Sequence, residues 1–315
     1  ALVPRHDPDA DGAVVLERPA SADEATRRVA VVVDPFLGQH LRPHQRAGVR
    51  FLYHSVAQHG TGCILADAMG LGKTLQAITL LWTLLKQGAT GAPLAKKVLI
   101  VAPTSLTRNW DAELRKWLGP QRLKALVVCD QPRAKVAALV ADFASTPAPA
   151  HVISCEQLRM HKKAFAGMRV DVTMCDEGHR LKNAAAALRR ALRAVACTRR
   201  VILSGTPNPN DLDEFFALMQ FVAPHVCSAD MAPASFERSV QRMRKLAELT
   251  HRFVLRRTAD ILERCYLPPK AEAVLFCRLS PLQHALYHRA VSSRRMASFL
   301  RGSGGGGGGD DDDDV

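Results

Sequence analysis

The sequence predicts an α/β fold in which helices flank a mostly parallel sheet. From Leu41 to about Ala223, short apolar runs alternate with amphipathic segments of helical length. Apolar runs separated by helices are typical of parallel strands, because both faces of such a sheet are buried. The 315 residues include 47% apolar and 23% charged side chains, which is enough to bury a core of normal size.

Six apolar runs are the expected strands, and helical spacing identifies the first connection. The runs are 63–66, 98–102, 126–128, 152–153, 172–175 and 201–203. The segment that begins at Lys73 follows the first run, and its apolar residues share one helical face. These residues are Leu75, Ile78, Leu81, Trp82 and Leu85.

The composition divides the chain into four parts. Residues 1–40 are an N-terminal extension rich in Pro, Ala and charge, and residues 41–223 form the α/β lobe. Residues 224–300 are mostly helical in pattern and strongly basic. Residues 301–315 hold a glycine run followed by five aspartates, and such a tail is expected to be disordered.

The charge indicates a polyanionic partner. The net charge is +13, and it is +18 over residues 1–309 because the five terminal aspartates are left out. A pI of about 9.7 favours nucleic acid, although a soluble basic surface is the alternative. No membrane partner is expected, since the longest apolar candidate, 64–85, is broken by Asp67 and Lys73.

The N-terminal residues and the cysteines indicate a reducing compartment. The first residues lack the charged-then-apolar layout of a secretory signal. The eight cysteines are scattered singly, with no Cys-x-x-Cys pair. This spacing argues against a zinc site or a disulfide framework.

The first chemical motif follows the run 63–66 and is typical of a phosphate-binding loop. Its glycines let the backbone turn tightly toward phosphate oxygens, and the following helix adds its dipole. Lys73 would reach the β- and γ-phosphates, and Thr74 would hold Mg²⁺. A Gly-rich turn is the alternative, and Asp67 stands where the strict pattern has Gly. The nucleotide-binding candidates are Asp67, Met69, Gly70, Leu71, Gly72, Lys73 and Thr74.

Two acidic residues end the run 172–175 and supply the second motif. Asp176 can join the Mg²⁺ shell, and Glu177 can polarise an attacking water. Adjacent acids alone usually cap or solvate a loop. At a strand end 103 residues after Lys73, they instead indicate a nucleoside triphosphatase.

Two further motifs complete the order that is typical of helicase-like motors. Ser204 and Thr206, in Ser-Gly-Thr-Pro, follow the run 201–203 and could link the acidic pair to a bound polymer. Alone, this tetrapeptide is only a turn. Gln45 precedes the phosphate loop, and its paired donor and acceptor could read the adenine edge.

Through these motifs and their order, the sequence resembles the Swi/Snf-type ATPases of helicase superfamily two. The resembling segments are 41–45, 65–74, 102–110, 116–119, 153–159 and 176–183. Further segments are similar to the Rad fifty-four branch, the double-stranded DNA translocases of homologous recombination. These are 31–35, 255–262, 267–270 and 277–287. The resemblance covers about residues 29–290.

The resemblance implies the first RecA-like lobe of a two-lobe P-loop motor that binds and hydrolyses MgATP. Thr104, Ser105 and Arg108 would lie along a DNA backbone, and Ser204 and Thr206 would couple the ATP state to the grip on DNA. Trp110 and Trp117 are expected to be packing residues on a helix face. Double-stranded DNA and a RecA-like recombinase filament are the implied partners, and the nucleus is the implied compartment.

The sequence also departs from the family. Ala68 stands where the family usually has Glu, and Pro209 stands where it usually has Gln. The second lobe is expected from near residue 290, where this sequence enters its glycine and aspartate run. We therefore expect the ATP-binding half of a DNA translocase. A catalytically silent ATP- or DNA-binding module and an RNA helicase are the alternatives, and the Gln motif and the Trp-Leu-Gly segment argue against the latter.

Overall fold

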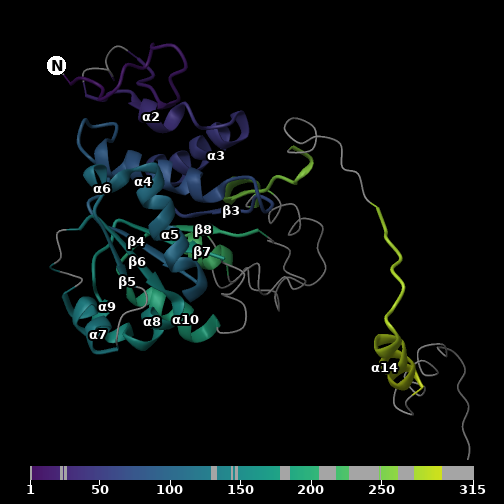
Figure 1. Cartoon of the computed structure of the whole chain (residues 1–315). Helices are drawn as coiled ribbons and strands as arrows, with labels where there is room; N and C mark the ends of the chain where they lie inside the picture. Colours follow the sequence, from purple (N-terminus) through teal and green to yellow (C-terminus); the bar gives the residue numbers. More distant parts are fainter. Residues whose placement is uncertain are drawn as a thin grey trace, which may run out of the picture. The chain divides into compact units, whose positions relative to one another are not determined.

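The computed structural model describes residues 2–21, 24, 27–128, 133–142, 145, 148–177, 185–205, 218–226, 248, 250–261 and 273–292. The chain divides into two compact units, Ala1–Leu267 and Pro268–Val315. The first unit is an α/β lobe built on one large sheet (Figure 1).

All seven strands of the large sheet run parallel, in the order β5-β6-β4-β7-β8-β3-β9. The strands are β3 Cys63–Leu65, β4 Val98–Ala102, β5 Ala125–Val128, β6 Ala150–Ser154, β7 Val172–Asp176, β8 Arg199–Leu203 and β9 Val254–Leu255. Six of them coincide with the predicted runs to within two residues at each end, so the predicted parallel sheet is confirmed. The seventh, β9, lies in a segment that the sequence pattern had indicated as helical.

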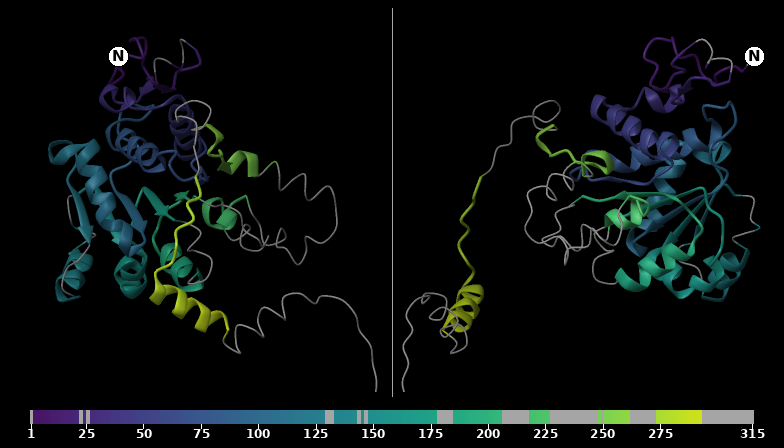
Figure 2. Two further views of the ribbon diagram at one scale, coloured as in Figure 1. Left: turned by 45° about the vertical axis from the view of Figure 1, so that its right-hand side comes forward. Right: turned by 180° about the vertical axis from the view of Figure 1, so that it is seen from behind.

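Helices cover both faces of this sheet (Figures 1 and 2). One face carries α3 Pro43–Tyr53, α4 Lys73–Lys86 and α5 Thr104–Trp117; the other carries α7 Arg133–Ala141, α8 Cys155–Met160, α9 Lys162–Phe165 and α10 Ala185–Ala194. Alternate residues of β4 enter two separate core clusters, with Val98 and Ile100 in one and Leu99 and Val101 in the other. Burial on both faces explains why the strands are continuous apolar runs.

The helix predicted after the first run is confirmed as α4, and its five predicted core residues are buried. Its burial is not confined to one face, because every residue from Leu75 to Leu85 is buried, Gln76, Thr79 and Thr83 included. Shorter elements connect the larger ones. They are α2 Pro35–Gly38, the π-helix η1 His54–Gln58 and α6 Gly119–Arg122.

Residues near the N-terminus are hydrogen-bonded to α3 and α4 and pack against them. Strands β1 Val15–Glu17 and β2 Val31–Val32 form an antiparallel pair. The Tyr53 hydroxyl donates to Glu17 Oε2 at 2.8 Å, and Trp82 Nε1 donates to Asp34 Oδ2 at 2.9 Å. The apolar residues of this region join the core cluster of α3 and α4. They are Val14, Val31, Val33 and Leu37.

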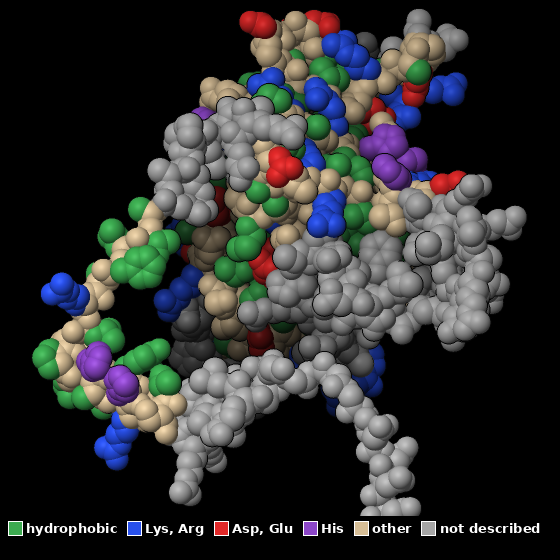
Figure 3. All heavy atoms as spheres, turned by 90° about the vertical axis from the view of Figure 1, so that its right-hand side faces the viewer, with side chains coloured by type: hydrophobic (Ala, Val, Ile, Leu, Met, Phe, Trp, Pro, Cys, Tyr) green, Lys and Arg blue, Asp and Glu red, His purple; other side chains and the backbone are tan. Residues whose placement is uncertain are grey.

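The second unit contains α14 Pro281–Val291, which begins with a capping box. The Ser280 Oγ accepts the Gln283 N–H at 3.3 Å, and the Gln283 side chain accepts the Ser280 N–H at 3.0 Å. Phe276 and Leu282 are exposed, and hydrophobic side chains lie uncovered along this segment (Figure 3).

None of the helices among the described residues combines the length and the apolar character that a membrane span requires.

Gly62, which precedes β3, lies very close to two backbone carbonyl groups. A Cβ atom at this position would lie 2.1 Å from the Arg200 carbonyl oxygen and 2.7 Å from that of Val222. Gly62→Ala is therefore expected to lower the free energy of unfolding by about 1–3 kcal/mol, because backbone atoms must shift. Urea denaturation measures this loss as a lower unfolding midpoint, and an m-value equal to that of wild type would show that only stability has changed.

Gly38→Ala is the matched control, since its Cβ would make ordinary contacts of 3.6 and 3.9 Å with Val14 and Val33. It should leave stability unchanged or slightly raised, because Ala favours helix over Gly. Equal unfolding midpoints for the two variants would contradict the close approach at Gly62.

Candidate functional site

The chemical motifs meet at the carboxyl edge of the parallel sheet. Strand β8 lies between β7 and β3, and all three run in the same direction. The segments that leave these strands therefore emerge side by side, where open α/β sheets bind their ligands. The phosphate loop leaves β3, the acidic pair ends β7, and Ser204 follows β8.

The loop from β3 to α4 has the glycine conformations that the predicted phosphate-binding turn requires. Gly70 and Gly72 have φ angles of 86° and 76°, in the left-handed region that favours glycine. A Cβ at Gly72 would also lie 2.2 Å from Gln45 Nε2. Lys73 and the half-buried Thr74 then form the first turn of α4. Glycine is thus required at residue 72 by both conformation and space.

Lys73 is folded back over this loop. Its Nζ donates to the carbonyl oxygens of Asp67 at 2.7 Å and Ala68 at 3.2 Å. Burial lowers the pKa of Lys73, while the carboxylates of Asp67, Glu177 and Asp176 act to raise it. The ammonium group is therefore partly desolvated and held mainly by neutral acceptors.

Gln45 joins α3 to the phosphate loop. Its Oε1 accepts the Arg42 N–H at 2.9 Å, and its Nε2 donates to the Leu71 carbonyl at 3.2 Å. His44 Nε2 lies 3.2 Å from the same Leu71 oxygen. A side-chain amide has two N–H groups and two lone pairs, so these bonds leave one of each for a base. Adenine contact by Gln45 stays a prediction.

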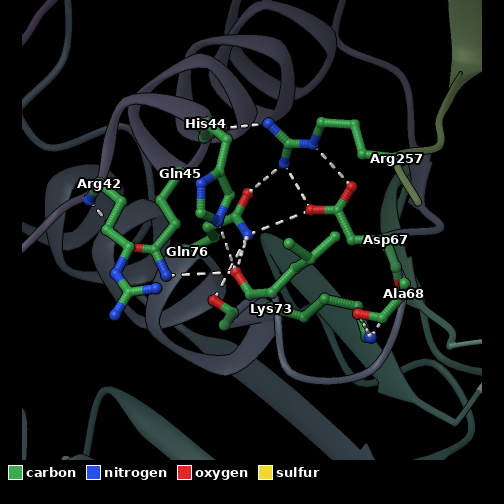
Figure 4. A network of polar contacts seen from close by, with 10 residues as sticks. Arg42, His44, Gln45, Asp67, Ala68, Lys73, Gln76 and Arg257 are labelled. Carbon is green, nitrogen blue, oxygen red and sulfur yellow. Dashed lines mark hydrogen bonds and ion pairs between the residues drawn. The ribbon is translucent and has the colours of Figure 1, made fainter. Parts of the chain in front are cut away.

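Asp67 is the centre of a polar network beneath the loop (Figure 4). Its carboxylate is fully buried and pairs with the Arg257 guanidinium, whose Nε donates to Asp67 Oδ1 at 2.8 Å. Gln76 Nε2 lies 3.3 Å from Asp67 Oδ2. The Asp that departs from the strict loop pattern is thus one half of a buried ion pair.

Trp110 and a backbone N–H hold the carboxylate of Asp176. Trp110 Nε1 donates to Asp176 Oδ2 at 2.8 Å, and the Glu177 N–H donates to Oδ1 at 2.9 Å. Burial raises the pKa of Asp176, and these two hydrogen bonds act to lower it. Glu177 has a φ of 51°, which is uncommon for a residue with a side chain.

The turn after β8 lies against the phosphate loop. The Ser204 N–H donates to the Leu65 carbonyl at 3.0 Å. A Cβ at Gly205 would lie 3.0 Å from Met69 Cγ and 3.8 Å from Lys73 Nζ. Ser204 is buried, and its Oγ has no hydrogen-bond partner among the described residues. Thr206 and Pro209 lie outside the described residues.

The predicted DNA-contacting residues lie at the start of α5, which leaves β4 at the same edge. Thr104, Ser105 and Arg108 are exposed there, and Thr104 Oγ1 donates to Glu156 Oε2 at 2.7 Å. On the same helix, Trp110 is fully buried, which confirms its expected packing role. Trp117 is only half-buried, and its Nε1 donates to Glu113 Oε2 at 2.8 Å.

The structure therefore brings the predicted nucleotide residues together and adds three that sequence reasoning missed. The additions are Gln76, Arg257 and the indole N–H of Trp110. Arg257 is separated from Asp67 by 190 residues. A pairing over that distance leaves no local pattern, and the segment 255–262 stood out only by its resemblance to the family, without indicating the partner of Arg257.

Comparison with known proteins agrees with this geometry. The sequence matches the family model described as the SNF2-related domain over residues 44–307. The chain belongs to this family. It is 25% identical to a solved structure, the "Sulfolobus solfataricus SWI2/SNF2 ATPase core in complex with dsDNA", with a TM-score of 0.59. That match covers 85% of this chain and 54% of the other, and the predicted fold class is confirmed.

Curated relatives of this SNF2-related chain have recombination names. It is 40% identical to "DNA repair and recombination protein RAD54B" of Gallus gallus, covering 95% of this chain and 35% of that protein. It is 41% identical to "DNA repair and recombination protein RAD54-like" of the same organism, covering 90% and 43%. The chain thus spans less than half the length of these relatives. The predicted resemblance to the Rad fifty-four branch is confirmed.

The indole of Trp110 can be tested as an orienting group for Asp176. Trp110→Phe keeps the ring but removes the donor, and a hydrogen bond to a charged group contributes about 1.5–3 kcal/mol. We expect Mg²⁺-dependent binding of a fluorescent ATP analogue to weaken about tenfold or more. The lost bond favours ionised Asp176, so the pKa of Asp176 should rise in the variant. As the pH is lowered, binding should therefore be lost at a higher pH in the variant than in wild type.

Trp117→Phe is the control, because this indole donates to a carboxylate within its own helix. It should leave both the affinity and its pH dependence unchanged. Identical behaviour of the two variants would show that the Trp110 bond does not support nucleotide binding.

Proposed function

We propose that the chain is the ATP-binding lobe of an ATP-dependent double-stranded DNA translocase that acts in recombination and repair. The carrying observation is that the parallel register of β3, β8 and β7 brings the loop with Lys73 and the acidic pair Asp176 and Glu177 to one edge of the sheet. The names of the relatives support a role in DNA repair, and the neighbouring ATPase core was solved with duplex DNA.

In this proposal each residue has one chemical role. Lys73 binds the transferred phosphate, and the loop N–H groups around Gly70 and Gly72 bind the others. Thr74 and Asp176 would hold Mg²⁺; a hydroxyl and a carboxylate are the hard oxygen donors it prefers, and both lie at this edge. Bound Mg²⁺ supplies charge neutralisation at the phosphates. Glu177 polarises the attacking water.

Coupling to DNA is assigned to the residues at the same edge. Thr104, Ser105 and Arg108 bind backbone phosphates at the start of α5, and Ser204 with Thr206 links them to the nucleotide. The buried Ser204 supports this role, since its N–H donates to the Leu65 carbonyl at the end of β3 and its Oγ has no partner among the described residues. The natural partners in this proposal are duplex DNA and a recombinase filament, in the nucleus.

A catalytically silent module and an RNA helicase remain as alternatives. Lys73, Asp176 and Glu177 are all present, which favours hydrolysis over a silent role. The basic charge suits either nucleic acid, so comparison of duplex DNA, single-stranded DNA and duplex RNA as binding partners separates translocase from RNA helicase.

The phosphate loop is tested by removing its lysine. The chain should bind MgATP weakly, and Lys73→Ala should abolish this binding, because the ammonium is the cation that meets the phosphates. Fluorescence titration with an ATP analogue measures it. Lys86→Ala is the control at the other end of α4, where Nζ lies 4.6 Å from the Trp82 ring centroid. Equal affinity of the Lys73 variant and wild type would refute the loop assignment.

The DNA-facing position of α5 is tested with two arginines seven residues apart. Arg108→Ala should weaken duplex binding uniformly across sequences and lower the slope of affinity against salt by about one, because one phosphate contact is lost. Arg115→Ala removes an exposed arginine in the last turn, which pairs with Asp111 at 2.9 Å, and should have a smaller effect. A salt-independent affinity, or equal losses in both variants, would contradict the assignment.

A further inference from the structure

Arg257 lies beside the phosphate loop because β9 extends the sheet past β3. Ile64 and Leu65 pair with Val254 and Leu255 in parallel register. The pairing continues into the loop, where the Ala66 N–H donates to the Leu255 carbonyl at 2.7 Å and the Ala68 N–H donates to the Arg257 carbonyl at 2.9 Å. The backbone after β9 therefore fixes the first residues of the phosphate loop.

The Arg257 side chain joins three elements that are distant in sequence (Figure 4). Its Nε and Nη2 bind both carboxylate oxygens of Asp67, at the start of the loop. Its Nη2 also donates to Gln76 Oε1 at 3.0 Å on α4, and its Nη1 donates to the His44 carbonyl on α3. The planar guanidinium suits this arrangement, because its donors have fixed directions.

A glycine in α3 makes room for this contact. A Cβ at Gly48 would lie 1.8 Å from Gln76 Oε1 and 2.8 Å from Arg257 Nη2. Any larger side chain at this buried position would displace the amide or the guanidinium. The space that Arg257 and Gln76 occupy is thus provided by a second, independent feature of the sequence.

The proposed nucleotide-binding residues are either hydrogen-bonded to, or next in sequence to, the residues that Arg257 contacts. Lys73 Nζ donates to the carbonyls of Asp67 and Ala68, and Gln45 follows His44 in the first turn of α3. Gln76 Nε2 also lies 3.4 Å from the carbonyls of Leu71 and Gly72. Among the described residues, the Arg257 side chain is hydrogen-bonded to Asp67, Gln76 and the His44 carbonyl, and not to Lys73, Gln45 or the glycines of the loop.

We infer that Arg257 is a positioning residue for nucleotide binding, which sets the phosphate loop and the Gln45 helix in one fixed arrangement through Asp67, Gln76 and the His44 carbonyl. This inference rests on the proposed function and extends it to a residue outside the recognised loop motifs. When Lys73 turns to a phosphate, the two carbonyls lose their donor, while Arg257 continues to hold the Asp67 carboxylate.

Arg257→Lys tests the inference without leaving a buried carboxylate unpaired. Lysine keeps the charge opposite Asp67 but cannot make the forked contact to three partners. We expect the thermal midpoint to stay close to that of wild type, and the affinity for methylanthraniloyl-ATP with Mg²⁺ to fall about tenfold or more, as for loss of a charge-assisted hydrogen bond.

The double variant Asp67→Asn with Arg257→Gln separates positioning from stability. It removes both charges, so no unpaired ion is left in the core, whereas Arg257→Gln alone should strongly lower the thermal midpoint. A merely structural pair predicts wild-type affinity for the folded double variant. A positioning role predicts that its affinity stays about tenfold or more below wild type.

Arg256→Gln is the matched control, because this neighbouring arginine is exposed and the same charge is lost. Its affinity and midpoint should equal those of wild type. Wild-type affinity in both the Arg257→Lys and the double variant, with binding still lost in Lys73→Ala, would overturn this inference alone. Binding that does not depend on Lys73 would overturn the proposed function, and this inference with it.

Discussion

The site depends on the parallel direction of all seven strands. Leu65 of β3 is level with Leu203 of β8 and with Leu255 of β9, and Leu203 is level with Asp176 of β7. The residues that follow these positions therefore leave the sheet at one height and on one edge. Segments separated by up to 190 residues in the chain become neighbours there, without any loop having to reach across the lobe.

Three charged side chains at this edge are buried or half-buried, and each is matched in a different way. Asp67 faces a full opposite charge on Arg257, whereas Lys73 is held by two neutral carbonyls and Asp176 by two N–H donors. An ion held by neutral dipoles gains when a group of opposite charge replaces them, because charge-assisted hydrogen bonds are stronger. The ion pair is thus suited to a fixed role, and Lys73 is suited to exchanging its two carbonyl partners for a phosphate.

Local patterns predicted much of this structure, and long-range pairings were missed. Five of the six predicted strands are almost wholly buried, so each contains a short apolar run, whereas β5 at the sheet edge is mostly half-buried. Lys73 and Thr74 were found because a phosphate loop is read within eight residues. Strand β9 has only two residues after a short helical stretch, and its identity comes from pairing with β3. Asp67 could be recognised only as a departure from the loop pattern. Its role in an ion pair could not be predicted, because its partner Arg257 is remote in sequence.

The Trp110–Asp176 and Arg257–Asp67 contacts are arranged in the same way relative to the sheet. Asp176 ends β7, and its indole donor comes from α5, which follows the neighbouring strand β4. Asp67 follows β3, and its guanidinium partner follows the neighbouring strand β9. Each carboxylate is thus oriented by a side chain from the segment beyond an adjacent strand. A shift of α5, where DNA contact is proposed, would act on Asp176 through Trp110, whereas a shift of the segment after β9 would act on the phosphate loop through Arg257. In the proposed function, the geometry of the bound nucleotide would therefore be set from two sides by segments that carry none of the nucleotide-binding motifs.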